Sequence, residues 1–192
     1  SPKVQTTRSR IRGILTEEET QLVFTDTPGL FDPKKKLEKA IVHAATEGIK
    51  DADLMCVIMD VSARPLLQWD KIRKYLPDEG QDRMILILNK IDRIDTKDLL
   101  ALSKELNDRY HFAATFMISA EKGQGVKDLV SYLKNRAEDS PWFFPADQLS
   151  DLPNRLLAAE ITREHLFRNL HQELPYHLTV ETEDWENFEN GD

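Results

Sequence analysis

The chain has 192 residues, of which 40% are hydrophobic and 31% are charged, a balance that is typical of a folded globular protein and excludes extensive disorder. Its formal net charge of −8 excludes non-specific binding to nucleic acid by the chain as a whole, because phosphate contacts need clustered lysine and arginine. The sequence contains neither a run of about eighteen apolar residues nor the layout of a signal peptide, so we expect a soluble protein of the cytoplasm.

An antiparallel hairpin is the first element that the sequence predicts. Residues 1–9 are polar and are interpreted as a loop. Two mainly apolar segments, residues 10–16 and 21–25, flank three glutamates at positions 17–19, which predicts two strands joined by a solvent-exposed turn. Residues 30–36 contain a proline and three lysines, and this breaker-rich composition predicts a mobile loop.

Helices and strands alternate from there to residue 137, which is typical of a doubly wound parallel sheet. Apolar residues at helical spacing predict a helix over 37–49. The apolar run over 54–59 predicts a buried strand in which Cys56, a single cysteine that excludes an internal disulfide, is a small core residue. The predicted elements that follow are a helix over 66–76 with Trp69 in its packing, a strand beginning at Met84, a helix over 96–110, a strand over 115–118, a tight turn at 123–125 and a helix over 126–137.

Residues 139–153 differ in composition and are interpreted as a linker. They contain three prolines and the aromatic cluster 142–144, which we expect to anchor the linker to the preceding helix rather than to stack on bases. A further helix is predicted over 154–172, and alternation predicts a strand over 176–182 before an acidic end at 183–192. The predicted apolar face of this helix comprises Leu156, Leu157, Ala159, Ile161, Leu166 and Leu170.

Polar residues at the end of the Met84 strand predict a site that reads guanine. The apolar run ends in Asn89-Lys90-Ile91-Asp92, and in a parallel sheet ligands bind at this carboxyl edge. The Asp92 carboxylate can accept hydrogen bonds from the N1–H and the exocyclic amine of guanine, while Asn89 reaches the base edge and the stem of Lys90 covers the ring. Adenine has the opposite pattern of donors and acceptors and would leave the carboxylate unpaired.

Two other predicted strands end in motifs that fit the rest of a guanine nucleotide. Asp26-Thr27-Pro28-Gly29 ends the hairpin, where Asp26 can hold Mg²⁺ through water and Gly29 lets its N–H approach a γ-phosphate. Ser119-Ala120-Glu121 ends the strand over 115–118, and the N–H groups that follow could meet the guanine carbonyl. Three such motifs in this order are far more specific than one alone.

Asp-Thr-Pro-Gly, Asn-Lys-Ile-Asp and Ser-Ala-Glu in this order resemble the translation-factor type of P-loop GTPase. More narrowly, residues 1–8, 160–164 and 173–176 are similar to the Era family of ribosome-assembly GTPases. The resemblance runs nearly from end to end. It implies an α/β fold with a P-loop GTPase-type doubly wound sheet, followed by the start of an α+β type II KH domain. The implied domains are a GTPase domain over 1–138, the linker over 139–153 and a truncated KH domain over 154–192.

The same resemblance implies roles for individual residues. Thr7, with Thr6 as the alternative, matches the Mg²⁺-binding threonine of the first switch loop, and Asp26 is the second residue of the metal site. Leu30 stands where Ras-type enzymes carry a glutamine that orients water, so the catalytic residue stays unassigned. Nucleotide binding is assigned to Asp26, Thr27, Pro28, Gly29, Leu30, Asn89, Lys90, Ile91, Asp92, Ser119, Ala120 and Glu121.

Two motifs of such a protein do not occur in the 192 residues. One is the phosphate-binding Gly-x-x-x-x-Gly-Lys-[Ser/Thr] loop, which follows a strand at the centre of the sheet, and the other is the Gly-x-x-Gly loop of a KH domain. We therefore expect an interior piece of an Era-like protein. These residues alone are expected to bind nucleotide weakly or not at all and to have no GTPase activity.

For the parent protein, the resemblance implies hydrolysis of GTP with Mg²⁺, coupled to binding of small-subunit ribosomal RNA and to ribosome assembly. Its partners would be GTP or GDP, this RNA and the assembling small subunit, with peripheral contact to the inner face of the membrane and a monomeric state. The alternative is a catalytically silent G-like scaffold for RNA or protein. An enzyme of adenine nucleotides or dinucleotides conflicts with Asp92 and with the absence of Gly-x-Gly-x-x-Gly.

Overall fold

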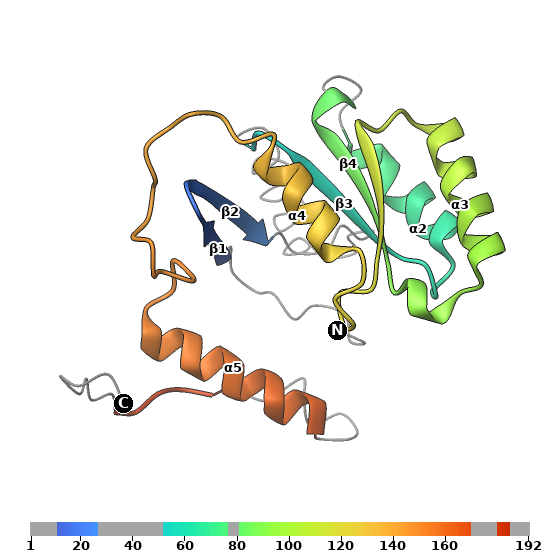
Figure 1. The fold of residues 1–192 in the computed structure, drawn as a ribbon. Coiled ribbons are helices and arrows are strands. Elements are labelled where there is room, and N and C mark those ends of the chain that lie inside the picture. The colour runs from blue at the N-terminus through green and yellow to red at the C-terminus, as the bar shows by residue number, and fades with distance from the viewer. Residues whose placement is uncertain (1–10, 27–51, 77–80, 170–179, 185–192) are drawn as a thin grey trace. The chain divides into compact units, whose positions relative to one another are not determined.

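A computed structural model of the chain describes residues 11–26, 52–76, 81–169 and 180–184 (Figure 1). These residues fall into two compact units. The first unit contains the described residues between 52 and 141, and the second combines residues 11–26 with those from 142 onward. The predicted loop over 1–9, the predicted helix over 37–49 and the motif residues 27–30 lie outside the described ranges.

The first unit is built on a three-stranded parallel sheet in the order β3-β4-β5. Its strands are β3 (Met55–Asp60), β4 (Met84–Asn89) and β5 (Ala114–Ile118). In the register, Asp60 lies opposite Asn89, which in turn lies opposite the last residue of β5. The three strands therefore end together at one edge of the sheet.

Helices cover both faces of this sheet, as the alternating sequence pattern predicts. They are α2 (Pro65–Ile72), α3 (Thr96–Arg109) and α4 (Val126–Lys134). Figure 1 shows α2 and α3 on one side of the sheet and α4 on the other. Short 3-10 turns complete the unit: η1 (Arg73–Tyr75), η2 (Gln81–Arg83) and η3 (Ile91–Arg93). The predicted α/β fold of the P-loop GTPase type is confirmed.

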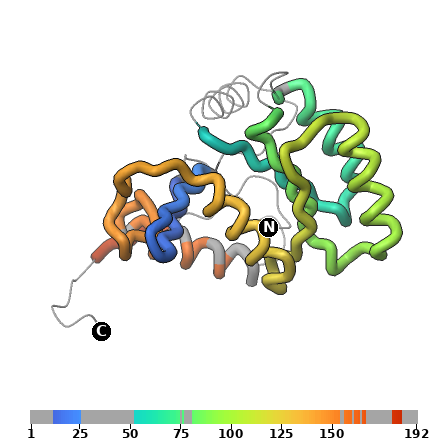
Figure 2. The backbone as a smooth tube through the Cα atoms, turned by 45° about the horizontal axis from the view of Figure 1, so that its top comes forward, coloured from blue at the N-terminus to red at the C-terminus, as the bar shows by residue number. Residues whose placement is uncertain are grey.

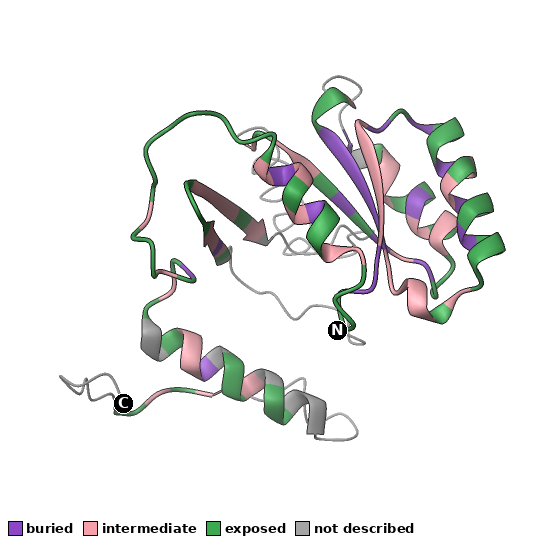
Figure 3. Ribbon diagram, in the orientation of Figure 1, coloured by how far each residue is buried: buried purple, intermediate pink, exposed green. Residues whose placement is uncertain are grey.

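The core of the first unit lies between β4 and the helices α2 and α3. The first five residues of β4 are buried (Figure 3), as expected of an apolar strand that is covered on both faces. Trp69 on α2 packs edge-on against Tyr110 and Phe112, with ring centroids 5.5 and 5.6 Å apart. Such aromatic contacts add to the free energy gained by burying the rings. The predicted packing role of Trp69 is confirmed.

Strand β3 is covered on one face, in contrast to β4. Val57 and Met59 are buried, whereas Ile58 is 63% exposed and Cys56 is exposed. The prediction that Cys56 is a core residue was therefore wrong. Successive side chains of a strand point to opposite faces, and Cys56 lies on the same face as Ile58, opposite to Val57 and Met59. In the described ranges β3 is also an edge strand, paired with β4 alone.

The second unit begins with the predicted hairpin. Strands β1 (Ile11–Glu17) and β2 (Thr20–Asp26) are antiparallel, and Glu17 lies opposite Thr20. The turn consists of Glu18, which has a positive φ of 55°, and Glu19. Both turn residues are exposed, as predicted, while the first of the three glutamates belongs to β1.

The linker binds this hairpin through main-chain and side-chain hydrogen bonds. Leu149 O accepts a bond from Ile14 N at 2.9 Å, and Ser150 forms an antiparallel bridge with Gly13. Asp151 Oδ1 accepts a bond from Arg12 N at 2.9 Å. Figure 2 shows the hairpin (blue) and the linker (orange) side by side. The linker thus adds a short third strand segment to the β1 edge of the hairpin.

The aromatic part of the linker also binds the hairpin, and its expected anchoring to the preceding helix stays a prediction. Trp142 Nε1 donates to Glu19 O at 3.0 Å. Gln21 Oε1 accepts bonds from the main-chain N–H groups of Phe143 and Phe144, both at 3.0 Å, and Gln21 Nε2 donates to Phe144 O at 2.9 Å. The physical reason is that the Gln21 amide pairs with both donors and acceptors of the linker main chain. Phe143 is 80% exposed, so described residues cover little of it.

Helix α5 (Asn154–Asn169) follows the linker, as predicted, and residues 170–172 of the predicted helix lie outside the described ranges. Of its predicted apolar face, Ala159 is buried, but Leu156, Ile161 and Leu166 are 46%, 50% and 39% exposed. The face is therefore largely uncovered by described residues. Residues 180–182 form no strand, in contrast to the prediction over 176–182, whose other residues lie outside the described ranges. No helix in the described ranges is long and apolar enough to cross a membrane.

Candidate functional site

The carboxyl edge of the three-stranded sheet brings together the polar residues that end each strand. Asp60 ends β3, Asn89 ends β4, and Ser119 directly follows β5. Because the strands are parallel and in register, these residues lie at one edge, where ligands bind in open α/β sheets.

Asn89 connects the loops that follow β4 and β5. Its Oδ1 accepts hydrogen bonds from Lys90 N at 2.8 Å and from Ala120 N at 3.1 Å. Its main-chain oxygen accepts a third bond from Val61 N at 3.1 Å, beyond the end of β3. The structure therefore places the predicted Asn89 and Ala120 in direct contact. It also occupies the Ala120 N–H, one of the groups predicted to meet the guanine carbonyl.

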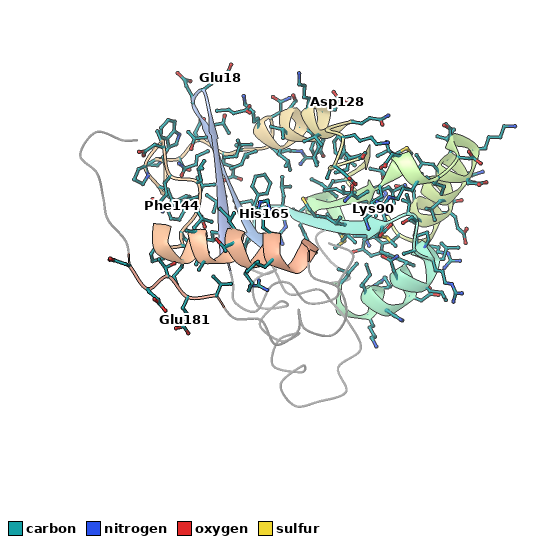
Figure 4. All side chains as sticks on the ribbon, turned by 90° about the horizontal axis from the view of Figure 1, so that it is seen from below. Glu18, Lys90, Asp128, Phe144, His165 and Glu181 are labelled. Carbon is teal, nitrogen blue, oxygen red and sulfur yellow. The ribbon has the colours of Figure 1, made fainter. Side chains whose placement is uncertain are left out.

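Lys90, which is labelled in Figure 4, forms an ion pair across the sheet edge with Asp60. Its backbone is left-handed, with φ 68° and ψ 38°, a conformation that costs a non-glycine residue about 1 kcal/mol. Its Nζ forms an ion pair and hydrogen bond with Asp60 Oδ2. The other carboxylate oxygen of Asp60 accepts bonds from Ser62 N at 2.9 Å and Ser62 Oγ at 2.6 Å. The charged end of Lys90 is thus fixed, and its stem runs from the end of β4 to the end of β3.

Opposing influences act on the pKa of Asp60, and the net shift is downward. Desolvation raises the pKa of this carboxyl, but the hydrogen bonds from Lys90 and Ser62 and the positive charge of Lys90 together lower it further. Both members of the ion pair are half-buried, with side chains 28% and 27% exposed. Asp60 is therefore ionised at neutral pH and available to hold the lysine.

Asp92 lies in η3, on the same loop, and faces the turn after β5. Its carboxylate is 3.4 Å from Lys122 Nζ, and its side chain is 12% exposed. The pKa of Asp92 is lowered, first by the Ser119 hydroxyl, against an opposing desolvation, and then by its own backbone and by Lys122. The Ser119 hydroxyl is buried and has no hydrogen-bond partner of normal geometry among the described residues. The carboxylate is ionised, as acceptance of guanine donors requires.

The turn after β5 is a tight loop that depends on glycine. Ser119 N donates to Gln124 O at 3.0 Å, and Gly123 and Gly125 both have positive φ, 70° and 72°. A side chain at Gly125 would collide with the main-chain oxygen of Met117. The predicted tight turn is confirmed, and it holds the residues after Ser119 against η3.

Several predicted site residues cannot be placed. Thr7, Thr27, Pro28, Gly29 and Leu30 lie outside the described ranges. Asp26 ends β2, but only its backbone is described, opposite Ile11. The described residues contain no group of three histidine, cysteine, aspartate or glutamate side chains that could hold a metal ion. The Mg²⁺ site with Thr7 and Asp26 stays a prediction.

Two charged residues of the site had no role in the sequence prediction. Asp60 ends an apolar strand, which is the same signal that identified Asp26 and the Asn89 motif. Lys122 follows Ser119-Ala120-Glu121 by one residue, and only the folded turn brings it to Asp92. Glu121, which was predicted, is exposed and 3.7 Å from Arg93 in an ion pair between the same two loops.

Comparison with known proteins gives a consistent result. Residues 1–90 match the family model described as 50S ribosome-binding GTPase. The chain is 50% identical over 189 residues to GTPase Era of Mesorhizobium japonicum, covering 98% of this chain and 61% of that protein. It is also 50% identical over 194 residues to GTPase Era of Dinoroseobacter shibae, covering 98% and 62%. The chain thus spans about three fifths of the length of these relatives.

Two solved structures are similar in fold. A crystal structure of Era in complex with MgGDPNP and a segment of 16S ribosomal RNA matches with a TM-score of 0.75 and 33% identity, over 92% of this chain and 60% of that one. A variant of Aquifex aeolicus Era bound to GDP and AlF4⁻ matches with a TM-score of 0.74 and 32% identity, over 91% and 60%.

The parallel sheet with helices on both faces, and the strand-end site at its carboxyl edge, define a P-loop GTPase-type α/β protein. Within this class, the chain is similar to GTPase Era over nearly its whole length.

Proposed function

We propose that the protein of which these residues form a part binds and hydrolyses GTP with Mg²⁺ and couples its nucleotide state to small-subunit ribosomal RNA. The observation that carries the proposal is the arrangement of Asn89, Asp92 and the turn after Ser119 at one edge of the sheet. It is supported by the likeness to an Era structure that holds MgGDPNP and 16S ribosomal RNA. Because ribosomal RNA is the proposed partner, we place the protein in the cytoplasm.

The described residues supply the half of the site that reads the base. The ionised Asp92 accepts the N1–H and the exocyclic amine of guanine, and Lys122 is one of the groups that lower the pKa of this carboxylate. Asn89 joins the two loops that would contact the base, through the hydrogen bond from the Ala120 N–H. An adenine base would present an acceptor to the carboxylate and be rejected, since a buried charge without a donor is costly.

The phosphates would be held by residues outside the described ranges. In this proposal Thr7 and Asp26 hold Mg²⁺, the Gly29 N–H senses the γ-phosphate, and the residue that activates water is not Leu30, whose side chain cannot polarise a water molecule. When bound, Mg²⁺ would neutralise charge on the phosphate oxygens. RNA binding is assigned to the region from residue 154 onward, and the monomeric state and the membrane contact stay predictions.

The test is a calorimetric titration of the natural full-length protein with GDP, ADP and XDP. Wild-type protein is expected to bind GDP and not ADP, and Asp92→Asn is expected to transfer the preference to XDP, whose extra carbonyl needs a donor. If the folded protein binds none of the three, the catalytically silent scaffold becomes the better description. GDP binding that is unchanged by Asp92→Asn would show that another residue reads the base.

A further inference from the structure

Asp60 is a charged residue of the site, and it has no role in the proposed recognition of guanine. It lies opposite Asn89 in the register of β3 and β4, one residue from Lys90. Its carboxylate is fully engaged, with Oδ1 accepting two bonds from Ser62 and Oδ2 bound to Lys90 Nζ. Because the bonds from Ser62 fix Oδ1, the carboxylate holds the lysine ammonium at Oδ2 in a defined position.

The contact with Asp60 determines where the lysine stem lies. A free lysine side chain samples many rotamers, and its methylene groups offer no defined surface. Here both ends are fixed, the backbone by the bond from Lys90 N to Asn89 Oδ1 and the ammonium by Asp60. The methylene groups therefore form an apolar strip along the sheet edge, beside the loop that carries Asp92.

The contact with Asp60 also keeps the ammonium of Lys90 away from Asp92. Asp92 already has one lysine nearby, Lys122, whose side chain is 61% exposed and free to withdraw into solvent. A second ammonium at this carboxylate would compete with the two donors of guanine, which need the same oxygens. Pairing with Asp60 satisfies the charge of Lys90 and leaves only its apolar stem for the base.

We propose that Asp60 is a positioning residue of the guanine site, which holds Lys90 extended so that its stem, and not its charge, meets the base. The inference rests on the proposed function. Asp60 acts through Lys90 and touches no nucleotide itself, so its contribution to affinity depends on the presence of a lysine ammonium at position 90.

The test is a double-mutant cycle on the natural full-length protein, with GDP affinity measured by calorimetry. Asp60→Asn keeps an oxygen for Ser62 but removes the charge, and is expected to weaken GDP binding about three- to fivefold, the upper range for one partly exposed ion pair. Asp60→Glu is expected to restore affinity to within about twofold of wild type, because the longer side chain still reaches the ammonium. Lys90→Met keeps an apolar stem without charge, and Asp60→Asn added to it is expected to cause no further loss.

A matched control is Asp70→Asn on α2. Asp70 forms an exposed ion pair with Arg109 at 3.4 Å in the same unit and away from the sheet edge, so GDP affinity should not change. Thermal unfolding of each variant checks the fold. Unchanged GDP binding by Asp60→Asn, or an equal loss in the wild-type and Lys90→Met backgrounds, would overturn the inference. Wild-type protein that binds no GDP would instead overturn the proposed function, and the inference with it.

Discussion

Gln21 is expected to be the main attachment point between the hairpin and the aromatic part of the linker. Its side-chain amide makes three hydrogen bonds to the linker, to the N–H groups of Phe143 and Phe144 and to Phe144 O, at 3.0, 3.0 and 2.9 Å. It makes a fourth to Thr16 Oγ1 at 3.2 Å. Gln21→Ala removes all four, and the linker main chain has to find water in their place.

The expected effect follows from the number and exposure of these bonds. A net contribution of about 0.5–1 kcal/mol for each half-buried bond to the linker gives a local loss of about 2 kcal/mol, or about 30-fold in the opening equilibrium. Amide hydrogen exchange measured by NMR at Phe143 and Phe144 should accelerate by this factor. Gln21→Glu keeps an acceptor for both amides but places an oxygen against Phe144 O, so it should give a smaller acceleration.

Gln148→Ala is the matched control. Its side chain donates to Ser150 O at 2.7 Å within the linker itself, so exchange at Phe143 and Phe144 should stay near the wild-type rate. The reasoning would be refuted if Gln21→Ala changed exchange at these two amides by less than about threefold. In that case, the contacts of residues 149–151 with β1 would suffice to hold the whole linker.

Three more outcomes are expected. Gly125→Ala combines a positive φ with a collision and should lower the free energy of unfolding by about 2–4 kcal/mol in urea denaturation, whereas Gly123→Ala, with open space around it, should cost only about 1 kcal/mol. Trp69→Ala removes a buried ring from the aromatic core and should cost about 3–5 kcal/mol in the same assay; a cost below 1 kcal/mol would contradict this packing. Lys122→Met should raise the pKa of Asp92 in a carboxyl NMR titration, because it removes one of the causes that lower it. Since the folded pKa of Asp92 lies below the ordinary 3.8, its stabilising effect is present above pH 3.8 and is lost as the pH falls through the lowered value, and this loss should be smaller in the variant.

Most of the described fold could be predicted from the sequence, because local patterns were consistent with the tertiary arrangement. The apolar run of β4 is a strand buried on both faces, and the turn at Gly123 and Gly125 has the positive φ that favours glycine. Cys56 was placed wrongly because an apolar run cannot indicate whether both faces of its strand are covered. That depends on neighbours far away in the sequence, which periodicity does not contain.

The positions of the candidate site residues that belong to strand-end motifs could be predicted from the sequence. Asn89 and Asp92 lie where a strand-end motif should place them, next to the turn after β5. The anchoring of Lys90 by Asp60 and the position of Lys122 were not predictable, since both contacts join segments about 30 residues apart through the register of the sheet. The binding of the linker to Gln21 was not predictable either, because nothing in a sequence indicates which groups a side-chain amide will pair with.

The docked linker has a consequence for the order in which the chain acquires its structure. Gln21 and Phe144 are separated by 123 positions, and the bonds at Arg12 span 139. At a synthesis rate of about 5–20 residues per second, the hairpin leaves the ribosome roughly 6–25 s before its linker partner exists. Closing a loop of this length costs about 4 kcal/mol of chain entropy beyond a constant term. The main-chain groups at the hairpin edge therefore stay hydrogen-bonded to water while the linker is absent. Folding of the intervening parallel sheet shortens the loop that must be closed. We therefore expect the second unit to fold after the first.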